Sequence, residues 1–192
     1  MRRHPVTNRE YLLFLNHLAE AGRMEEAMNL VPREPKRKTA EGEVLYLFKD
    51  GRFQLPSRRS LGPDIPVCYV DWLGAASFAE WEAERTGQPW RLPDELEWEK
   101  AARGVDGRYF PWGETPDPSW ACMRLSHSGK PRPVPVGSYP VDCSPYGIEG
   151  MAGNVGDWTI GAYREEGPVL DGDRAVIRTD GDGWREHVVM GG

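Results

Sequence analysis

Residues 91–104 read Arg-Leu-Pro-Asp-Glu-Leu-Glu-Trp-Glu-Lys-Ala-Ala-Arg-Gly, and they carry the clearest local signal in the chain. Asp94 and Glu97 have the spacing of a capping box, in which each side chain satisfies a backbone N–H at the start of a helix. Gly104 supplies the stop. The stretch predicts a short helix whose buried side holds Leu92, Trp98, Ala101 and Ala102.

Two further helices are predicted upstream of this stretch. Thr7 and Glu10 form a second capping box, and Gly22 ends the helix that follows. Asp71 can cap another helix, which Gly87 and Pro89 end. The expected buried residues are Tyr11, Phe14, Leu15 and Leu18 in the first helix, and the narrow stripe of Trp72, Ala75, Ala76 and Ala79 in the second.

A hairpin is predicted between these two helices. Residues Val44–Phe48 and Arg52–Leu55 flank Asp50-Gly51, a dipeptide that tolerates the positive φ angles of a tight turn. From Tyr109 onward Pro and Gly recur every few residues, so no long helix is expected there. Val134–Val136 and Val188–Met190 are the apolar segments that could form strands.

The composition bounds what the protein can bind. The 192 residues suit a single domain, and 24 basic against 30 acidic side chains give a net charge of −6. This balance argues against a nucleic-acid partner, which needs a clustered basic field. The one basic cluster, Arg33 with Lys36, Arg37 and Lys38, lies among prolines and is predicted to be a solvated loop.

No apolar run approaches the roughly 20 residues that span a bilayer, and the first residues lack a secretory apolar core. The prediction is therefore a cytoplasmic protein without a membrane partner. The 8 Trp, 22 Gly and 17 Pro predict a loop-rich fold in which indoles fill much of the core.

The three cysteines, Cys68, Cys122 and Cys143, cannot all pair within one molecule, and none has the spacing of a zinc site. Copper(I) needs thiolates held close together, and no two of these cysteines lie within a helical turn or a hairpin register. They are interpreted as reduced, structural thiols.

Other polar groupings favour structural roles. Glu95, Glu97 and Glu99 alternate and so point to different helix faces, and Glu97 is already the capping residue. Asp171-Gly172-Asp173 and Asp180-Gly181-Asp182-Gly183 lack the Gly and Glu of a calcium loop and are interpreted as turns. His127 and His187 have no motif partner that would support a hydrolase.

Several segments, taken in order, resemble the formylglycine-generating enzyme, or sulfatase-modifying factor, family. The resemblance implies an α+β domain with a C-type-lectin-like fold, here residues 1–192 with an insertion at about 23–64. The segments are Pro5-Val6-Thr7-Asn8, Pro66-Val67 with Val70-x-Trp72, Arg91–Gly104, Pro111-Trp112-Gly113, Pro135–Pro140, and Tyr146-Gly147 with Met151–Val155.

Active members of that family oxidise a cysteine of a client sulfatase to formylglycine with oxygen, copper and a C-terminal pair of cysteines that follows an Arg-Gly-Gly-Ser-Trp segment. Residues 188–192, Val-Val-Met-Gly-Gly, resemble the approach to that segment, and Cys143 lies well upstream of it. The sequence therefore looks trimmed at both ends, no catalytic residue is assigned, and copper is expected only with the missing cysteines restored.

Some family members bind calcium around a Gly-Asn-Val-Trp-Glu-Trp segment and an upstream Asn. Here the segment reads Gly153-Asn154-Val155-Gly156-Asp157-Trp158, and Ala121-Cys122 stands where the family often has Ala-Asn. The resemblance implies a residual calcium site at Asn154, Val155 and Asp157. The alternative is that Asn154 only stabilises a turn and Asp157 is an ordinary surface acid.

Two functions of different class are predicted. The first is a lectin-like binding or sensory module for a protein or peptide, without oxidase activity. The second is a formylglycine-generating oxidase whose catalytic C-terminal segment is missing. A third, the related iron-dependent sulfoxide synthases, is disfavoured because their His-rich helical domain is absent from this sequence.

The resemblance also implies open sheet edges, because family domains have strands before Pro5 and after Gly192. Val188–Met190 is therefore predicted to be frayed or paired with another chain, and the isolated domain to be marginally stable or to self-associate.

Overall fold

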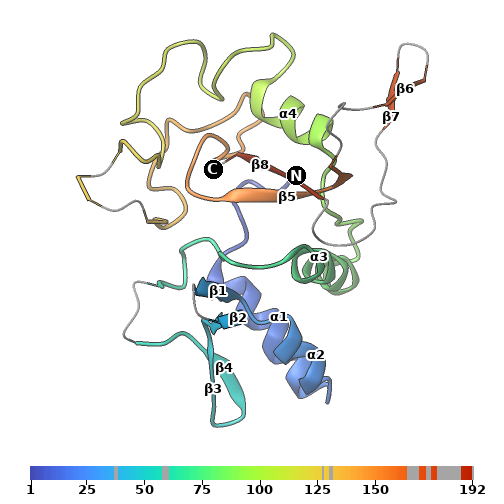
Figure 1. The fold of residues 1–192 in the computed structure, drawn as a ribbon. Helices are drawn as coiled ribbons and strands as arrows, with labels where there is room; N and C mark the ends of the chain where they lie inside the picture. Colours follow the sequence, from blue (N-terminus) through green and yellow to red (C-terminus); the bar gives the residue numbers. More distant parts are fainter. Residues whose placement is uncertain are drawn as a thin grey trace. The chain divides into compact units, whose positions relative to one another are not determined.

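The computed structural model describes residues 1–36, 39–57, 61–126, 128–129, 132–163, 169–171, 174–176 and 187–191. The chain forms two compact units (Figure 1). Unit 1 takes in Met1–His4, Leu92–Pro133 and Gly137–Gly192, and unit 2 takes in Pro5–Arg91 and Val134–Val136.

Unit 2 is built from three helices and two hairpins. The helices are α1 (Asn8–Glu20), α2 (Met24–Asn29) and α3 (Trp72–Thr86). The antiparallel hairpins are β1 (Arg33–Lys36) with β2 (Thr39–Val44), and β3 (Leu47–Lys49) with β4 (Arg52–Gln54).

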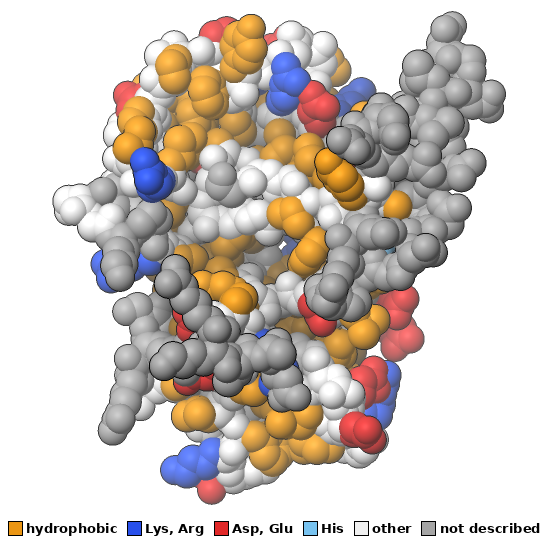
Figure 2. Space-filling view, in the orientation of Figure 1, with side chains coloured by type: hydrophobic (Ala, Val, Ile, Leu, Met, Phe, Trp, Pro, Cys, Tyr) orange, Lys and Arg blue, Asp and Glu red, His pale blue; other side chains and the backbone are white. Residues whose placement is uncertain are grey.

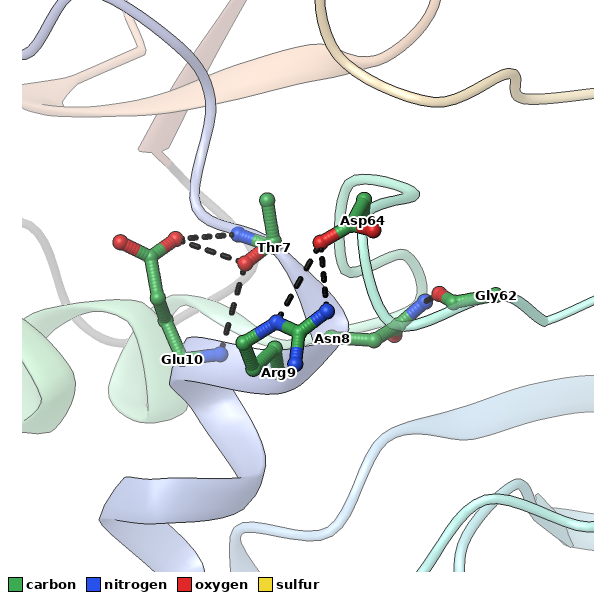
Figure 3. A network of polar contacts seen from close by, with 6 residues as sticks. All are labelled: Thr7, Asn8, Arg9, Glu10, Gly62 and Asp64. Atoms are coloured by element: carbon green, nitrogen blue, oxygen red, sulfur yellow. Dashed lines mark hydrogen bonds and ion pairs between the residues drawn. The ribbon is translucent and has the colours of Figure 1, made fainter.

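The start of α1 is fixed by side chains, as the capping-box prediction required (Figure 3). The Glu10 carboxylate accepts from the Thr7 backbone N–H at 2.8 Å, and Thr7 Oγ1 accepts from the Glu10 N–H at 3.4 Å. Arg9 donates to Asp64 at 2.9 Å, and Asn8 Nδ2 donates to the Gly62 carbonyl at 3.0 Å. These contacts anchor the first turn of α1 to residues 62–64.

The core of unit 2 lies along α1, and the four predicted buried positions of that helix are confirmed. Phe14 is 1% exposed, and its ring centroid lies 5.5 to 5.8 Å from those of Tyr11, Phe78 and Trp81. The other buried residues of this cluster are Leu15, Leu18, Ala27, Leu30, Val31, Leu45, Tyr46 and Phe53.

Helix α3 is also confirmed, but it buries a different face from the predicted one. Gly74, Phe78 and Glu82 are the buried residues, whereas the stripe of Trp72 and alanines is only half-buried. A Cβ on Gly74 would lie 2.6 Å from the Tyr11 hydroxyl, so glycine permits this close approach. Glu82 is buried because Arg85 Nε donates to it at 2.9 Å, an interaction that an apolar stripe cannot reveal.

The predicted hairpin is β3–β4, and its turn residues Asp50 and Gly51 have φ angles of 53° and 77°. Hairpin β1–β2 and helix α2 were not predicted. The solvated-loop prediction was wrong for Arg33 and Lys36, which begin and end strand β1; Arg37 and Lys38 lie outside the described residues. The pairing of β1 with β2 gives these residues ladder hydrogen bonds that a charge count cannot show.

Within its described residues, unit 1 has helix α4 (Glu95–Arg103) and strand β5 (Gly156–Ala162) paired with β8 (His187–Gly191). A further short hairpin joins β6 (Val169–Asp171) to β7 (Arg174–Val176). The capping box of Asp94 and Glu97 is formed as predicted. The prediction that Trp98 is buried is also confirmed, because it is 7% exposed and packs with Ala101, Ala102 and Met151.

Strand β8 corrects the prediction that Val188–Met190 would be frayed or paired with another chain. Val189 stands opposite Trp158, and Met190 stands opposite Asp157, in an antiparallel ladder with β5. The partner strand was not predicted because β5 contains Gly156 and Gly161, which weaken a strand pattern. Val134–Val136 is not a strand, although Val136 N donates to the Asp64 carbonyl at 2.9 Å.

The described residues thus form four helices and short antiparallel strand pairs, which confirms the α+β fold class. Within the same residues, none of the helices has the length and hydropathy needed to cross a bilayer.

Candidate functional site

The segment that carries the predicted calcium ligands packs on α4 through one side-chain contact. Trp98 Nε1 donates to Asp157 Oδ2 at 2.9 Å. Burial raises the pKa of Asp157 to about 6, and the bond from Trp98 offsets part of this rise. Asp157 is therefore not the ordinary surface acid that the alternative interpretation assumed.

The residues just before Asp157 form a tight turn on the backbone of Cys122. Asn154 has a φ of 75°, and its N–H donates to the Cys122 carbonyl at 2.8 Å. A Cβ on Gly153 would lie 2.4 Å from that carbonyl oxygen, so only glycine allows the approach. Val155 N donates to the Gly153 carbonyl at 3.0 Å. The structure thus shows a stabilised turn at Asn154.

These residues fit calcium poorly. Calcium takes six to eight oxygen ligands. Among the described residues no three His, Cys, Asp or Glu side chains gather in a way that could hold a metal ion. One Asp157 oxygen already accepts from an indole. Calcium at Asn154, Val155 and Asp157 stays a prediction.

A second buried acid, Asp142, escaped the sequence analysis. It is 1% exposed, and its carboxylate accepts from Ala152 N at 3.1 Å. Burial raises its pKa to about 6; backbone bonds from Ala152 and Met151 lower it, and the charge of Glu149 raises it. A single Asp in a Pro-Val-Asp-Cys turn carries no spacing signal that could have found it.

The three thiols lie in partly buried surroundings. All are free and half-buried, and each Sγ donates to a backbone carbonyl: Cys68 to Pro66, Cys122 to Arg132 and Cys143 to Ser144. Burial raises the pKa of the Cys68 thiol to about 11 and also raises that of Cys122, which lies near the charge of Asp142. Reactive thiols have lowered pKa values instead.

The glutamates of α4 make separate contacts, and Glu97 caps the helix as predicted. Glu97 closes the capping box, and Glu99 pairs with Arg103. Glu95 packs against β5, where a Cβ on Gly161 would meet its carboxylate. His187 lies beside the same glycine, with Nδ1 3.3 Å from its carbonyl. His127, Gly172-Asp173 and residues 180–183 lie outside the described residues.

The loops after α4 hold an aromatic cluster. The prediction that indoles fill much of the core was wrong, because Trp98 is the one buried tryptophan among the described residues and the core is otherwise made of Tyr, Phe, Leu, Val, Ala and Met. Phe110 and Trp112 stack with ring centroids 5.2 Å apart, and Trp120 meets Trp112 edge-on at 5.9 Å. Tyr109 and Leu125 in the same loops are 78% and 75% exposed. Figure 2 shows hydrophobic side chains gathered over the region that Figure 1 draws as α4 and these loops.

The sequence matches a protein-family model along its whole length. The model of the sulfatase-modifying factor enzyme 1-like domain covers residues 1–192, and the chain belongs to this family. The expected family resemblance is therefore confirmed.

Two curated relatives and one solved structure are similar to the chain. Hercynine oxygenase of Mycolicibacterium smegmatis is 36% identical over 169 residues, which cover 84% of this chain and 37% of that protein. Formylglycine-generating enzyme of Streptomyces coelicolor is 34% identical over 125 residues, 57% of this chain and 37% of that protein. The structure of PvdO from Pseudomonas aeruginosa has a TM-score of 0.51 and 24% identity over 76% of this chain and 54% of that one, which supports the fold alone.

The chain thus spans less than two fifths of the length of either curated relative.

Proposed function

We propose that the chain supplies the substrate-binding scaffold of an oxygen-dependent oxidase of the sulfatase-modifying factor family, and that its three cysteines are structural. The observation that supports a structural role for the cysteines is the surroundings of their thiols. Each Sγ lies within hydrogen-bonding distance of a backbone carbonyl, as structural thiols commonly do. Burial opposes thiolate formation at Cys68 and Cys122.

The two curated relatives described above support an oxidase. One is named as an oxygenase that acts on hercynine and the other as an enzyme that generates formylglycine. The substrate classes proposed for this chain are accordingly a cysteine in a protein or peptide and a small hercynine-like molecule. The exposed aromatic and aliphatic side chains of the loops after α4 give such a ligand an apolar surface to contact.

Copper or iron would supply the oxygen chemistry in such an enzyme. The donor set of the described residues does not fit either metal. Copper favours paired thiolates and iron favours clustered His and carboxylate side chains, and among the described residues no group of three His, Cys, Asp or Glu side chains could hold a metal ion.

The experiment combines binding with chemistry. A Cys-x-Pro-x-Arg peptide and hercynine are titrated against the chain, with tryptophan fluorescence as the readout and a Ser-x-Pro-x-Arg peptide as matched control. We expect binding of one of the two ligands. Its affinity should be unchanged in a triple Cys68→Ser, Cys122→Ser, Cys143→Ser variant.

Mass spectrometry then follows the peptide after incubation with copper and oxygen. We expect no loss of peptide sulfur that depends on the three cysteines. Sulfur loss by the wild-type chain that disappears in the triple variant would show that these thiols react. Failure of both ligands to bind would overturn the scaffold role.

A second candidate is a binding or sensory module that has no oxidase activity and recognises a protein or peptide. The absence of thiolate character at Cys68 and Cys122 favours it. Peptide binding without conversion of either substrate under copper or iron would distinguish this function from the first. Self-association, bound calcium and a cytoplasmic location are further proposals, checked by light scattering, calcium calorimetry and cell fractionation.

A further inference from the structure

We propose that the loops after α4 bind an arginine side chain of an extended peptide segment. The site is made of three rings, those of Phe110, Trp112 and Trp120, and two carboxylates, those of Glu114 and Asp117, all in unit 1. It rests on the proposed function in one respect, the contact of a ligand with these loops, and it adds the chemical group that is recognised.

The three rings form an aromatic surface. Phe110 and Trp112 lie nearly parallel, at an interplanar angle of 4°, and Trp120 meets Trp112 edge-on. All three side chains are only partly buried, so part of their surface is accessible to a ligand. Among the described residues, no cationic side chain lies over any of these rings. The electron-rich face of an indole attracts a guanidinium.

The charges of residues 105–120 favour a cationic ligand. Arg108 donates to both carboxylate oxygens of Asp106, at 3.0 and 2.6 Å, so these two charges balance each other. Glu114 and Asp117 are the remaining charged side chains of the segment, and both are acidic. Hydrogen bonds from the Ser119 hydroxyl and N–H hold the pKa of Asp117 below its usual range, so this carboxylate stays ionised.

Unit 2 shows that such groups hold an arginine within this same chain. The Arg85 guanidinium carbon lies 5.4 Å from the ring centroid of Trp81. Its Nε and Nη2 donate to the Glu82 carboxylate at 2.9 and 3.0 Å. One indole and one carboxylate thus bind one guanidinium there, and the loops after α4 present the same two kinds of group.

Hydrogen bonds fix the shape of these loops before a ligand arrives. Arg103 donates to the carbonyls of Gly107 and Arg108 at 2.6 and 2.7 Å. Phe110 and Gly113 exchange two backbone hydrogen bonds at 2.9 and 3.0 Å, and the indole of the site lies within this turn. A surface that is already ordered loses little conformational entropy when a ligand binds.

The same loops carry exposed apolar side chains for the neighbours of the arginine. Val105, Tyr109 and Leu125 are 85%, 78% and 75% exposed, more than any other large apolar side chain of the described residues. Exposed apolar groups of this size mark interaction sites. The ligand that fits is therefore an arginine with apolar residues beside it.

The test uses a blocked Gly-Leu-Arg-Leu-Gly peptide, which lacks cysteine, and a matched peptide with citrulline in place of arginine. Citrulline has nearly the same shape and no charge. NMR spectra of the tryptophan indole N–H groups locate the contact and give the affinity. We expect the signals of Trp112 and Trp120 to move while that of the buried Trp98 does not. The citrulline peptide should bind roughly fivefold to thirtyfold more weakly.

Variants assign the preference for arginine to its groups. Glu114→Gln combined with Asp117→Asn should remove most of the preference over citrulline, whereas Glu25→Gln, at an exposed glutamate of α2, should leave it unchanged. Trp112→Leu should weaken binding of the arginine peptide about fivefold, and Trp112→Phe, which keeps an aromatic face, should restore most of the affinity.

Equal affinity for the two peptides, signal changes confined to the tryptophans of unit 2, or no binding of the arginine peptide would overturn the arginine site. The proposed function is tested separately, because it fails when neither the cysteine peptide nor hercynine binds.

Discussion

The two units of this chain are stabilised by different means. In unit 2, three helices and the hairpins pack apolar side chains into one cluster, in which the rings of Phe14, Phe78 and Trp81 meet at 5.5 to 5.8 Å. In unit 1 the apolar cluster is small, with one large ring, Trp98, beside two alanines and Met151. The buried polar groups of unit 1, among them Asp142 and Thr159, make hydrogen bonds that help to stabilise its fold.

Because of this difference, the stability of each unit should depend on different changes. An apolar core responds to the loss of volume and little to pH, because its members do not ionise. A fold that buries carboxyl groups responds to pH as well, because the pKa values of Asp142 and Asp157 are both raised to about 6. The predictions below test this contrast, from the largest effect to the smallest.

The largest loss of stability is expected from Phe14→Ala in unit 2. Phe14 is 1% exposed and touches three aromatic rings, so truncation leaves a cavity that the neighbouring helices cannot fill. The free energy of unfolding should fall by about 3 to 5 kcal/mol in urea titrations. The adjacent Leu13 is 60% exposed, and Leu13→Ala should change it by less than about 0.5 kcal/mol. Equal losses of stability in the two variants would show that Phe14 is not part of the core.

In unit 1 the corresponding change is Trp98→Ala, with an expected loss of about 3 kcal/mol, the lower end for a buried indole because the cluster around it is small. Trp98→Phe separates packing from hydrogen bonding. It keeps most of the ring volume but leaves Asp157 without its donor at 2.9 Å, which should cost about 1 to 3 kcal/mol. Leu96→Ala, on the same helix but 39% exposed, is the control. A Trp98→Phe variant with wild-type stability would show that the bond to Asp157 is dispensable.

The third prediction concerns pH. The folded-state pKa of Asp157 is about 6, above the value of about 3.9 expected in an unfolded chain. The native state therefore binds more protons between about pH 4 and 6, and its contribution to stability falls as the pH rises through that window. Asp157→Asn keeps an acceptor for Trp98 and removes the titration.

The variant should therefore be more stable than the wild-type chain at pH 7 by roughly 2 kcal/mol, with the difference vanishing near pH 4. Urea unfolding at a series of pH values measures it. Parallel pH profiles for the two proteins would mean that Asp157 titrates normally in the folded state.

The sequence predicted those parts of the fold whose cause is local. Capping boxes at Thr7 and Asp94, the Asp50-Gly51 turn and the apolar face of α1 each depend on residues a few positions apart. The face of α3 was mispredicted because its burial depends on a distant hydroxyl, that of Tyr11, and on the ion pair of Glu82.

The same distinction holds for the candidate site. The Asn154–Asp157 segment was found through a family resemblance, but its contacts with Cys122 and Trp98 join residues 32 and 59 positions apart. Asp142 gave no signal at all in the sequence, because a single carboxylate acquires its character only from the residues that bury it. Strand β8 was recognised, whereas its pairing with β5 required knowledge of the fold.

The smallest losses of stability are expected at the capping boxes, which begin a helix in each unit. Asp94→Ala removes the acceptor for Glu97 N at 2.7 Å and should cost about 1 kcal/mol, whereas Asp94→Asn, which can still accept, should cost a few tenths. Thr7→Ala should cost at least as much, because Thr7 is 8% exposed and its hydroxyl also donates to Glu10 at 2.8 Å. Thermal unfolding of the four proteins, wild type included, ranks them. If Asp94→Asn proved as unstable as Asp94→Ala, the negative charge of Asp94 near the positive end of α4 would be the stabilising interaction. The cap of α4 would then be electrostatic, whereas the cap of α1 depends on hydrogen bonds.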